Sequence, residues 1–518
     1  MQIYLTQGLH RAVQQHPQHL ATLCGTRRQD WRTLVQRVAC LAAALRAQGL
    51  RPGERVALLA HNSDHCVEAF LAIWWAGGVV CPLNTRWSPA EMRHALQDVD
   101  PRLLLVDAAL APAAQALAAQ PPGLPSLWLG AGDAPPDMPR TEALLAAASP
   151  LEDERRAGDA LAVILYTGGT TGFPKGVMLS HANLWSACAA RLAQVPGTSI
   201  SLLATPLFHV AGLGRLVGQI VQGSTCVIDT QFRPERVLAA IAEHGVSEVM
   251  LVPSMLQMLL DDPAFGAARL ASLRRILHGA APMPQALLQR AMQALPQVEF
   301  VAAYGMTETA ASASLNGPFT LANHAQHAGR LASVGRASWG CELRIAGPGG
   351  EGLPAGEVGE ICVRGPSVMQ GYWRQPEATA QVLRNGWMHT GDGGWMDDGG
   401  HVHLVDRLKD MIISGGENVY SLEVESVLMR HPAVALCAVV GVPDAQWGEA
   451  VHAVVVLRPG QACAPEALRQ HCRAHLAGFK SPRAVHLVDA LPLSPTGKIL
   501  KNRLREQLAA AAPARAAS

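Results

Sequence analysis

The chain has 518 residues, of which 49% are hydrophobic and 16% are charged, and its formal net charge at pH 7 is +1. This length predicts roughly two to four folding units. The balanced charge and the lack of a long Lys/Arg run argue against nucleic-acid binding. The 11 cysteines are scattered without a CxxC pair, which argues against a zinc site or a disulfide framework and indicates reduced thiols in a cytoplasmic protein.

Neither a signal peptide nor a transmembrane helix is expected. The segment 1–18 lacks a basic stretch followed by an apolar block. The longest apolar run, 70–83, is shorter than the ~20 residues that span a membrane and contains glycines. We interpret this run as a buried helix that leads into a buried strand. Peripheral contact with a membrane surface and formation of a homodimer both stay open.

Helix and strand patterns alternate along the first three hundred residues. The first expected helices are 31–49 and 90–100, and the first expected strands are 54–63 and 101–107. The Pro- and Gly-rich stretch 119–141 predicts a surface connection. The alternation resumes in the segments 223–230, 237–253, 274–282 and 296–305. Such alternation predicts a mostly parallel sheet that is covered by helices on its faces.

The pattern changes in the last third of the chain. Short strands with glycine turns over 341–365 predict a β-rich subdomain. Small helices and strands alternate again further on, and the chain closes with a Gly–Lys turn and a helix over 493–509. We therefore predict an α/β protein. Residues 1–408 form a large N-terminal domain of layered, mostly parallel sheets with helices and a β-rich subdomain, and residues 409–518 form a small α+β domain.

The segment 166–176, YTGGTTGFPKG, has the composition of a phosphate-binding loop and follows an apolar run. Inward-pointing backbone N–H groups of such a loop can bind an anion. The candidate side-chain donors are Thr167, Thr170, Thr171 and Lys175. The Walker A spacing is not met, because Pro174 takes the place of its second glycine and Gly176 follows the lysine. No GxGxxG joins a strand to a helix here. A plain surface turn is the alternative.

Seven motifs, in this order, resemble those of the adenylate-forming superfamily, which includes AMP-forming acyl-CoA synthetases, luciferases and the adenylation domains of peptide synthetases. They are YTGGTTGFPKG (166–176), PLFHVAG (206–212), HGAAP (278–282), YGMTET (304–309), TGD (390–392), DRLKDMIISGGENVY (406–420) and PTGKILK (495–501). The resemblance implies two steps. A carboxylate attacks the α-phosphate of ATP to give acyl-adenylate and pyrophosphate, and a thiol, most often that of coenzyme A, then displaces AMP.

The resemblance also implies the nucleotide site. It comprises Thr167, Gly168, Gly169, Thr170, Thr171, Gly172, Lys175, Gly279, Ala280, Ala281, Pro282, Tyr304, Gly305, Thr307, Asp392, Arg407 and Lys498. Glu308 is the expected Mg²⁺ ligand, since this hard ion takes carboxylate and phosphate oxygens. Tyr304 stacks on adenine and Asp392 accepts the ribose hydroxyls. Gly168 stands where the family most often has serine, so we expect a modest change in nucleotide affinity.

The catalytic residues implied by the resemblance are Lys498, His209, Thr307 and Glu308. Lys498 bridges the attacking carboxylate and the α-phosphate, and His209 flanks the acyl carboxylate. The acyl and coenzyme A sites comprise Phe208, His209, Val210, Leu213, Ala303, Met306, Ser414, Gly415, Gly416 and Glu417. Lys409 stands at the hinge about which the small domain rotates between the two steps. Lys480 and Arg483 are candidate partners of the anionic end of coenzyme A.

The expected acyl pocket is apolar or small-sided and uncharged, which argues against an amino acid substrate. We predict a cytoplasmic, ATP- and Mg²⁺-dependent acyl-CoA synthetase for a medium- or long-chain fatty acid. An aryl or arylpropenoic acid–CoA ligase and an acyl-AMP ligase that loads a carrier protein are the nearer alternatives. A luciferase-like monooxygenase is a further hypothesis. A non-catalytic nucleotide-binding protein is a less favoured one, since both Lys498 and Glu308 are present.

Overall fold

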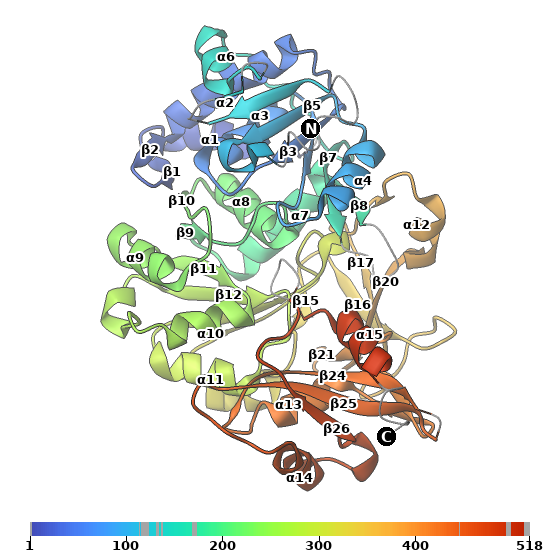
Figure 1. Cartoon of the computed structure of the whole chain (residues 1–518). Coiled ribbons are helices and arrows are strands. Elements are labelled where there is room, and N and C mark those ends of the chain that lie inside the picture. Colours follow the sequence, from blue (N-terminus) through green and yellow to red (C-terminus); the bar gives the residue numbers. More distant parts are fainter. Residues whose placement is uncertain are drawn as a thin grey trace.

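The computed structural model describes residues 3–112, 114, 124–130, 134–135, 138–167, 174–444, 446–493 and 499–511. Within these residues the strands form four β-sheets, and helices pack between and around them (Figure 1). The chain runs through the sheets from the blue N-terminal region to the red C-terminal region. None of the described helices is long and apolar enough to cross a membrane.

The first sheet has seven strands in the order β18-β8-β7-β4-β3-β5-β6. Their bounds are β3 Arg55–Leu59, β4 Val79–Pro82, β5 Leu103–Asp107, β6 Ser126–Leu129, β7 Leu161–Thr167, β8 Lys175–Ser180 and β18 Gly371–Tyr372. Strands β3 to β7 pair in parallel, and β8 and β18 add an antiparallel edge. The accompanying helices are α1 Gln7–Gln15, α2 Trp31–Ala47, α3 Asp64–Trp75, α4 Pro89–Val99, α6 Thr141–Ala147 and the short η1 Ala108–Leu110.

The second sheet has nine strands in the order β15-β14-β13-β12-β11-β9-β10-β1-β2. Their bounds are β1 Leu20–Cys24, β2 Arg27–Asp30, β9 Ile200–Leu203, β10 Thr225–Ile228, β11 Glu248–Leu251, β12 Arg275–Gly279, β13 Glu299–Tyr304, β14 Ser314–Phe319 and β15 Arg336–Ala337. Its helices are α7 His181–Gln194, α8 Val210–Gln222, α9 Pro234–His244, α10 Pro253–Asp261, α11 Gln285–Ala294, η2 Ala267–Leu270, η3 Thr307–Thr309 and η4 His324–Arg330. The central strands are parallel, as the alternation of helix and strand predicts.

The remaining two sheets are smaller. The β-rich subdomain contains β16 Glu342–Ala346, β17 Gly359–Arg364, β19 Leu383–Arg384, β20 Trp387–Met396 and β21 Val402–Arg407, next to α12 Pro376–Val382. The C-terminal sheet contains β22 Ile412–Ser414, β23 Glu417–Val419, β24 Val434–Asp444, β25 Gly448–Leu457 and β26 Ala484–Leu487, with α13 Ser421–Leu428, α14 Pro465–His475, η5 Gly478–Lys480 and α15 Lys501–Ala511. The expected boundary at residues 408 and 409 falls in the turn between β21 and β22 and stays a prediction.

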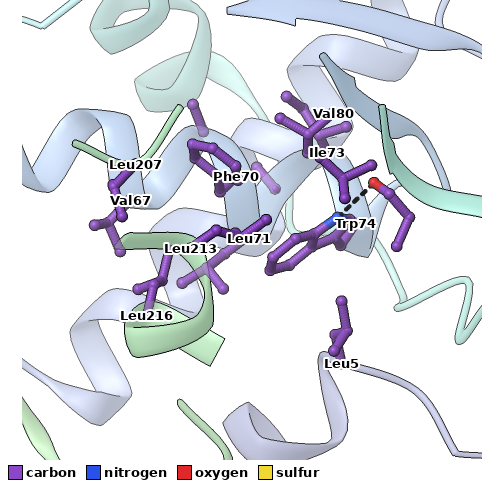
Figure 2. Packing of buried hydrophobic residues seen from close by; sticks show 14 of the residues in the cluster. Leu5, Val67, Phe70, Leu71, Ile73, Trp74, Val80, Leu207, Leu213 and Leu216 are labelled. Carbon is purple, nitrogen blue, oxygen red and sulfur yellow. Dashed lines mark hydrogen bonds between the residues drawn. The ribbon is translucent and has the colours of Figure 1, made fainter. Parts of the chain in front are cut away.

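The largest apolar core lies around α3, which is buried on nearly all sides (Figure 2). Phe70 and Trp74 are among the largest fully buried side chains, and the Trp74 indole Nε1–H donates to the Ala162 carbonyl at 2.9 Å. Leu213 and Leu216 of α8 pack into the same core. The apolar run 70–83 is therefore a buried helix followed by the buried strand β4, as expected, because a helix that is apolar all round must be enclosed.

One sequence-based expectation is wrong in part. The Pro- and Gly-rich stretch 119–141 contains a strand, β6, which pairs in parallel with β5. The run Leu127–Leu129 is buried, and this burial outweighs the turn-forming residues on either side of it. A short apolar run between turn signals is consistent with a buried strand, and its length is too small for a helix.

Leu213→Ala should destabilise the fold by about 2–5 kcal/mol, because it removes a fully buried side chain and leaves a cavity in the largest core. The measurement is the thermal midpoint, with Met258→Ala as the control because Met258 is half exposed. Equal midpoints for the two variants would contradict the packing of Leu213.

Candidate active site

The phosphate-loop motif joins β7 to β8, and both of its anchor residues are described. Thr167 closes β7 and pairs across the antiparallel hairpin with Lys175, which opens β8. Gly168, Gly169, Thr170, Thr171 and Gly172 lie outside the described residues. The Lys175 Nζ lies 5.2 Å from the centroid of the Tyr372 ring on the neighbouring strand β18. The ammonium group is therefore placed beside an aromatic face within range of a cation–π contact.

Tyr372 connects this hairpin to the expected Mg²⁺ ligand. Its hydroxyl donates to Oε1 of Glu308 at 2.9 Å, and the backbone carbonyl of Glu308 accepts the Met369 N–H at 2.8 Å. Burial and the charge of Glu308 raise the pKa of Tyr372 above its ordinary range, so the phenol stays protonated and donates. The carboxylate is held in one orientation and retains further lone pairs, which suits a hard cation with phosphate oxygens.

Sequence reasoning missed Tyr372. It lies 64 residues from Glu308 along the chain and occupies a strand of only two residues. A strand of two residues shows no periodicity in the sequence. The Gly–Tyr–Trp segment also lies at no characteristic sequence distance from the YGMTET segment. The contact arises because β18 returns from the β-rich subdomain to pair with β8 of the first sheet.

Three expected nucleotide residues form one cluster. The Tyr304 hydroxyl donates to Oδ2 of Asp392 at 2.8 Å, and Nε of Arg407 lies 2.6 Å from Oδ1 of the same carboxylate. Asp392 and Arg407 are register partners across β20 and β21. Asp392 is 4% exposed, so the carboxylate is fixed by a phenol and a guanidinium while it keeps acceptor capacity. Its role toward the ribose hydroxyls and the stacking role of Tyr304 stay predictions.

The segment that is expected to line the adenine begins at the end of β12 and is packed closely against β13. Gly279 is the register partner of Ala303 on β13, and a Cβ on this glycine would lie 2.3 Å from the Ala303 carbonyl oxygen. Ala280 then takes a left-handed conformation with φ of +63°. Ala281 and Pro282 continue the turn at the surface side, and Gly305 and Thr307 follow β13 next to it in the sheet. The two loops that follow neighbouring parallel strands therefore emerge together.

The acyl-side residues precede and begin α8. His209 is the N-cap residue of this helix, and its ring centroid lies 4.5 Å from that of Phe208. Its Nε2 is buried without a hydrogen-bond partner among the described residues. Burial and the charge of Arg86 lower the pKa of His209 to about 4, so the imidazole is neutral near pH 7. A buried ring nitrogen without a partner suits a ligand that brings its own polar group.

The other residues expected in the acyl site lie in different surroundings. Leu213 is fully buried in the largest core, so its packing gives the pocket role no support. Val210 packs partly against that core. Ala303 packs against a separate small apolar cluster on the face of the second sheet, and Met306 is half-buried before η3.

The hinge region carries a buried polar network. Lys409 is exposed in the turn between β21 and β22. On either side of it, Asp406 accepts the Ser421 hydroxyl at 2.6 Å, and Asp410 lies 2.8 Å from Nη2 of Arg505 on α15. Lys501, at the start of α15, lies 2.7 Å from Glu425. Lys498 lies outside the described residues, three positions before this helix.

The expected coenzyme A residues form a tight hairpin. Ser414 and Glu417 are register partners of β22 and β23, and Gly415 and Gly416 between them have φ of +62° and +85°. Two left-handed residues in a two-residue turn call for glycine. The other two candidates already have partners. Lys480 pairs with Glu423 at 2.8 Å, and Arg483 stacks over Trp447 at 4.2 Å.

Two further groups of potential metal ligands occur among the described residues. Glu360, Cys362 and His389 lie together on β17 and β20, but Glu360 binds the His389 ring and the Gly391 N–H and so supports the TGD segment. His65, Glu68 and Glu142 lie together near α3, where Arg37 pairs with both carboxylates. Both groups therefore have internal partners, and Glu308, which is bound by Tyr372, is the better metal candidate.

The site combines mostly parallel sheets, the β7–β8 hairpin and the Asp392 carboxylate held between a phenol and a guanidinium. Comparison with known proteins identifies the family of this chain. The family model described as AMP-binding enzyme matches residues 9–373, and the model described as AMP-binding enzyme C-terminal domain matches residues 423–498. The chain belongs to the AMP-binding enzymes, and its resemblance to the adenylate-forming superfamily is confirmed.

Similar proteins extend over the whole chain. It is 41% identical over 502 residues to a feruloyl-CoA synthase from Amycolatopsis sp, which covers 96% of this chain and 97% of that protein. It is 36% identical over 506 residues to the fatty acid–[acyl-carrier-protein] ligase ScoC from Streptomyces coeruleorubidus, covering 96% and 94%. The structure of ATP-bound MatB from Rhodopseudomonas palustris matches with a TM-score of 0.88 at 31% identity, covering 98% and 99%. The expected fold class is confirmed.

Tyr372→Phe should raise KM for Mg²⁺ and for ATP by roughly tenfold or more, because the substitution removes the hydrogen bond that orients the Glu308 carboxylate. Steady-state kinetics with Mg²⁺ and ATP varied separately would measure this effect. Tyr4→Phe is the matched control, since Tyr4 lies near the N-terminus and contacts His10. Unchanged constants in Tyr372→Phe would show that Glu308 needs no such support.

Proposed function

We propose that this enzyme activates a carboxylic acid with ATP as acyl-adenylate and transfers the acyl group to coenzyme A, releasing pyrophosphate and AMP. The observation that carries the proposal is the chain of contacts from Lys175 through Tyr372 to Glu308, which joins the phosphate-loop hairpin to a metal-binding carboxylate. The Tyr304–Asp392–Arg407 cluster supplies a second anchor for the same nucleotide. Together these two groups of contacts suit the binding of ATP, whose β- and γ-phosphates leave as pyrophosphate.

In the first step negative charge grows on the α-phosphate as the carboxylate attacks. Thr307 and Lys498 are the proposed donors at this phosphate, and preorganised donors of this kind are the largest source of stabilisation in such reactions. Lys175 holds the departing pyrophosphate. Mg²⁺ bound at Glu308 would neutralise phosphate charge. A neutral His209 can donate or accept one hydrogen bond at the acyl carboxylate without adding charge to an apolar site.

In the second step the small domain turns about Lys409 and presents the 414–417 hairpin to the acyl-adenylate. The two glycines of this hairpin lack side chains, so the pantetheine arm can pass close to the backbone. The contacts of Lys501 with Glu425 and of Arg505 with Asp410 support a rotation in which α15 stays with the hinge turn and the small sheet.

The identity of the acid and the identity of the acceptor are the more specific parts of the proposal. Similar proteins are named for ferulate and for fatty acids, and for both coenzyme A and a carrier protein. They therefore do not favour the fatty acid over the arylpropenoic acid. We propose coenzyme A as acceptor because the feruloyl-CoA synthase, at 41% identity, is more similar to this chain than the carrier-protein ligase, at 36%.

The experiment that tests this function is acid-dependent pyrophosphate release across a panel of fatty and aryl acids, with coenzyme A, a pantetheinylated carrier protein or no acceptor. Acyl-CoA and AMP should form in equal amounts with coenzyme A. Thioester on the carrier protein alone would favour the carrier-loading alternative. Oxygen-dependent light or the absence of any acid-dependent pyrophosphate would overturn the proposal.

Lys498→Ala should slow adenylate formation by at least about 100-fold, because one preorganised donor at the α-phosphate is lost. Conversion of supplied acyl-adenylate to acyl-CoA should stay near the wild-type rate, since the second step uses the rotated domain. Each half-reaction is measured separately, with Arg503→Ala as the control for a cation on the exposed side of α15. Equal losses in both half-reactions would refute the assigned role of Lys498.

A further inference from the structure

Helix α8 has two different faces. Leu213, Leu216 and Ile220 pack into the largest core (Figure 2). The opposite stripe faces the second sheet and is made of small and polar residues at spacings of three and four. These residues are Ala211, Gly214, Arg215, Gly218 and Gln219. Because α8 starts directly after His209, this stripe leads away from the acyl-carboxylate end of the site into the space between helix and sheet.

The near end of the stripe is apolar and small-sided. Ala211 and Ala303 pack against the cluster formed by Val195, Met250, Leu277, Val301 and Leu315. A Cβ built on Gly214 would meet only the Cβ of Ala311 within 4 Å, at 3.5 Å. The helix surface near His209 is therefore lined by small apolar groups and is not tightly packed at Gly214.

The far end of the stripe is polar and deeply buried. Nη2 of Arg215 donates to the Ser201 hydroxyl at 2.7 Å and pairs with Glu248. Nη1 of Arg191, from α7, lies 3.7 Å from the same Glu248 carboxylate. Arg215, Arg191 and Gln219 are 3%, 7% and 0% exposed.

Four donors at this far end have no acceptor among the described residues. They are Nε and Nη1 of Arg215, Nη2 of Arg191 and Nε2 of Gln219. A buried donor without a partner costs about 1–3 kcal/mol, and more when it is charged. All four come from α7 and α8, so they gather on one side of the space between the helices and the second sheet.

Positive charge exceeds negative charge around these donors. Arg191, Arg215 and Arg275 surround the single carboxylate of Glu248, and Arg275 also pairs with Glu299 at the rim. Burial, followed by the charge of Arg215, lowers the pKa of Arg191 to about 10. Since the arginines crowd one another, an additional acceptor oxygen, and above all an anionic one, would be favourable here.

We propose that this group of donors is the far wall of the acid pocket and selects carboxylic acids that carry an acceptor oxygen at the end opposite the carboxylate. Phenolic hydroxyl, methoxy, keto and second carboxylate groups share this chemistry. From His209 to Arg215 the helix rises by about 9 Å, which suits an acid with one ring and is short for an extended long alkyl chain. This inference rests on the proposed function and names its substrate class.

The test uses matched pairs of acids. The first pair is 3-phenylpropenoic acid and its 4-hydroxy-3-methoxy derivative, and the second is octanoic and octanedioic acid. The readout is kcat/KM for acid-dependent pyrophosphate release. Wild-type enzyme should favour the oxygen-bearing member of at least one pair by roughly tenfold to a hundredfold, the value of a hydrogen bond to a charged donor.

Gln219→Leu removes one donor and keeps every charge, so it should lower this preference, measured as the ratio of kcat/KM for the two acids of a pair. Arg215→Met combined with Glu248→Gln removes a cation and an anion together, and the glutamine amide oxygen leaves an acceptor for Arg191, which loses its anionic partner. This double variant should lose the preference, and its melting temperature is measured alongside to detect a loss of stability at Arg191. Arg290→Met is the control, because the side chains of Arg290 and its partner Asp261 are 43% and 47% exposed.

The outcomes distinguish a failure of this inference from a failure of the proposed function. Activation of acids without preference for a distal oxygen overturns the inference and leaves the proposed function standing. A preference that survives in Gln219→Leu and in the double variant also overturns it, and shows that Arg215 serves only to neutralise Glu248. If no acid is activated, the proposed function fails and the inference fails with it.

Discussion

The hydrogen bond from Tyr372 to Glu308 is the contact on which the arrangement of the site depends. It joins β18, at the edge of the first sheet, to the loop that follows β13 of the second sheet. Burial keeps the phenol protonated, so the bond has a fixed direction and the carboxylate stays an acceptor. Together with the backbone hydrogen bond from Met369 to Glu308, this bond joins the hairpin that carries Lys175 to the loop that carries Glu308.

Burial sets the charge of the groups around this contact. Burial and the charge of Arg86 lower the pKa of His209 to about 4, so its ring is neutral near pH 7, while the Asp392 carboxylate is fixed in place by Tyr304 and Arg407. The acid pocket combines an apolar entrance with a buried excess of guanidinium groups, and the two ends are only about two helical turns apart. An uncharged pocket was expected from the residues near His209. That expectation concerns the apolar end of the region between α8 and the second sheet, and not the end that contains the arginines.

The hinge shows how a small domain can move as one body. Lys501 and Arg505 tie α15 to Glu425 and Asp410, which both follow Lys409, whereas the hydrogen bond from Ser421 to Asp406 crosses the hinge. Lys498 lies three positions before α15 in the sequence, so the proposed rotation would move it together with this helix. Lys501 is half-buried in this network, whereas Lys409 is exposed and has room to change conformation.

The order of helices and strands was determined by the sequence itself, because the apolar spacing of each segment decides locally which face it must bury. The alternation over the first three hundred residues and the buried helix and strand at 70–83 follow from this rule, and the ordered motifs were sufficient to predict the family. Strand β6 was not predicted from the sequence, because burial outweighed its turn-forming neighbours. The pocket role of Leu213 stays a prediction, although its side chain packs in the largest core. Tyr372, Arg191 and Arg215 acquire their surroundings only when segments distant in sequence meet. Partners that pair across sheets leave no periodic signal in the chain, and the charge and hydrogen bonding of a buried group depend on which partners those are.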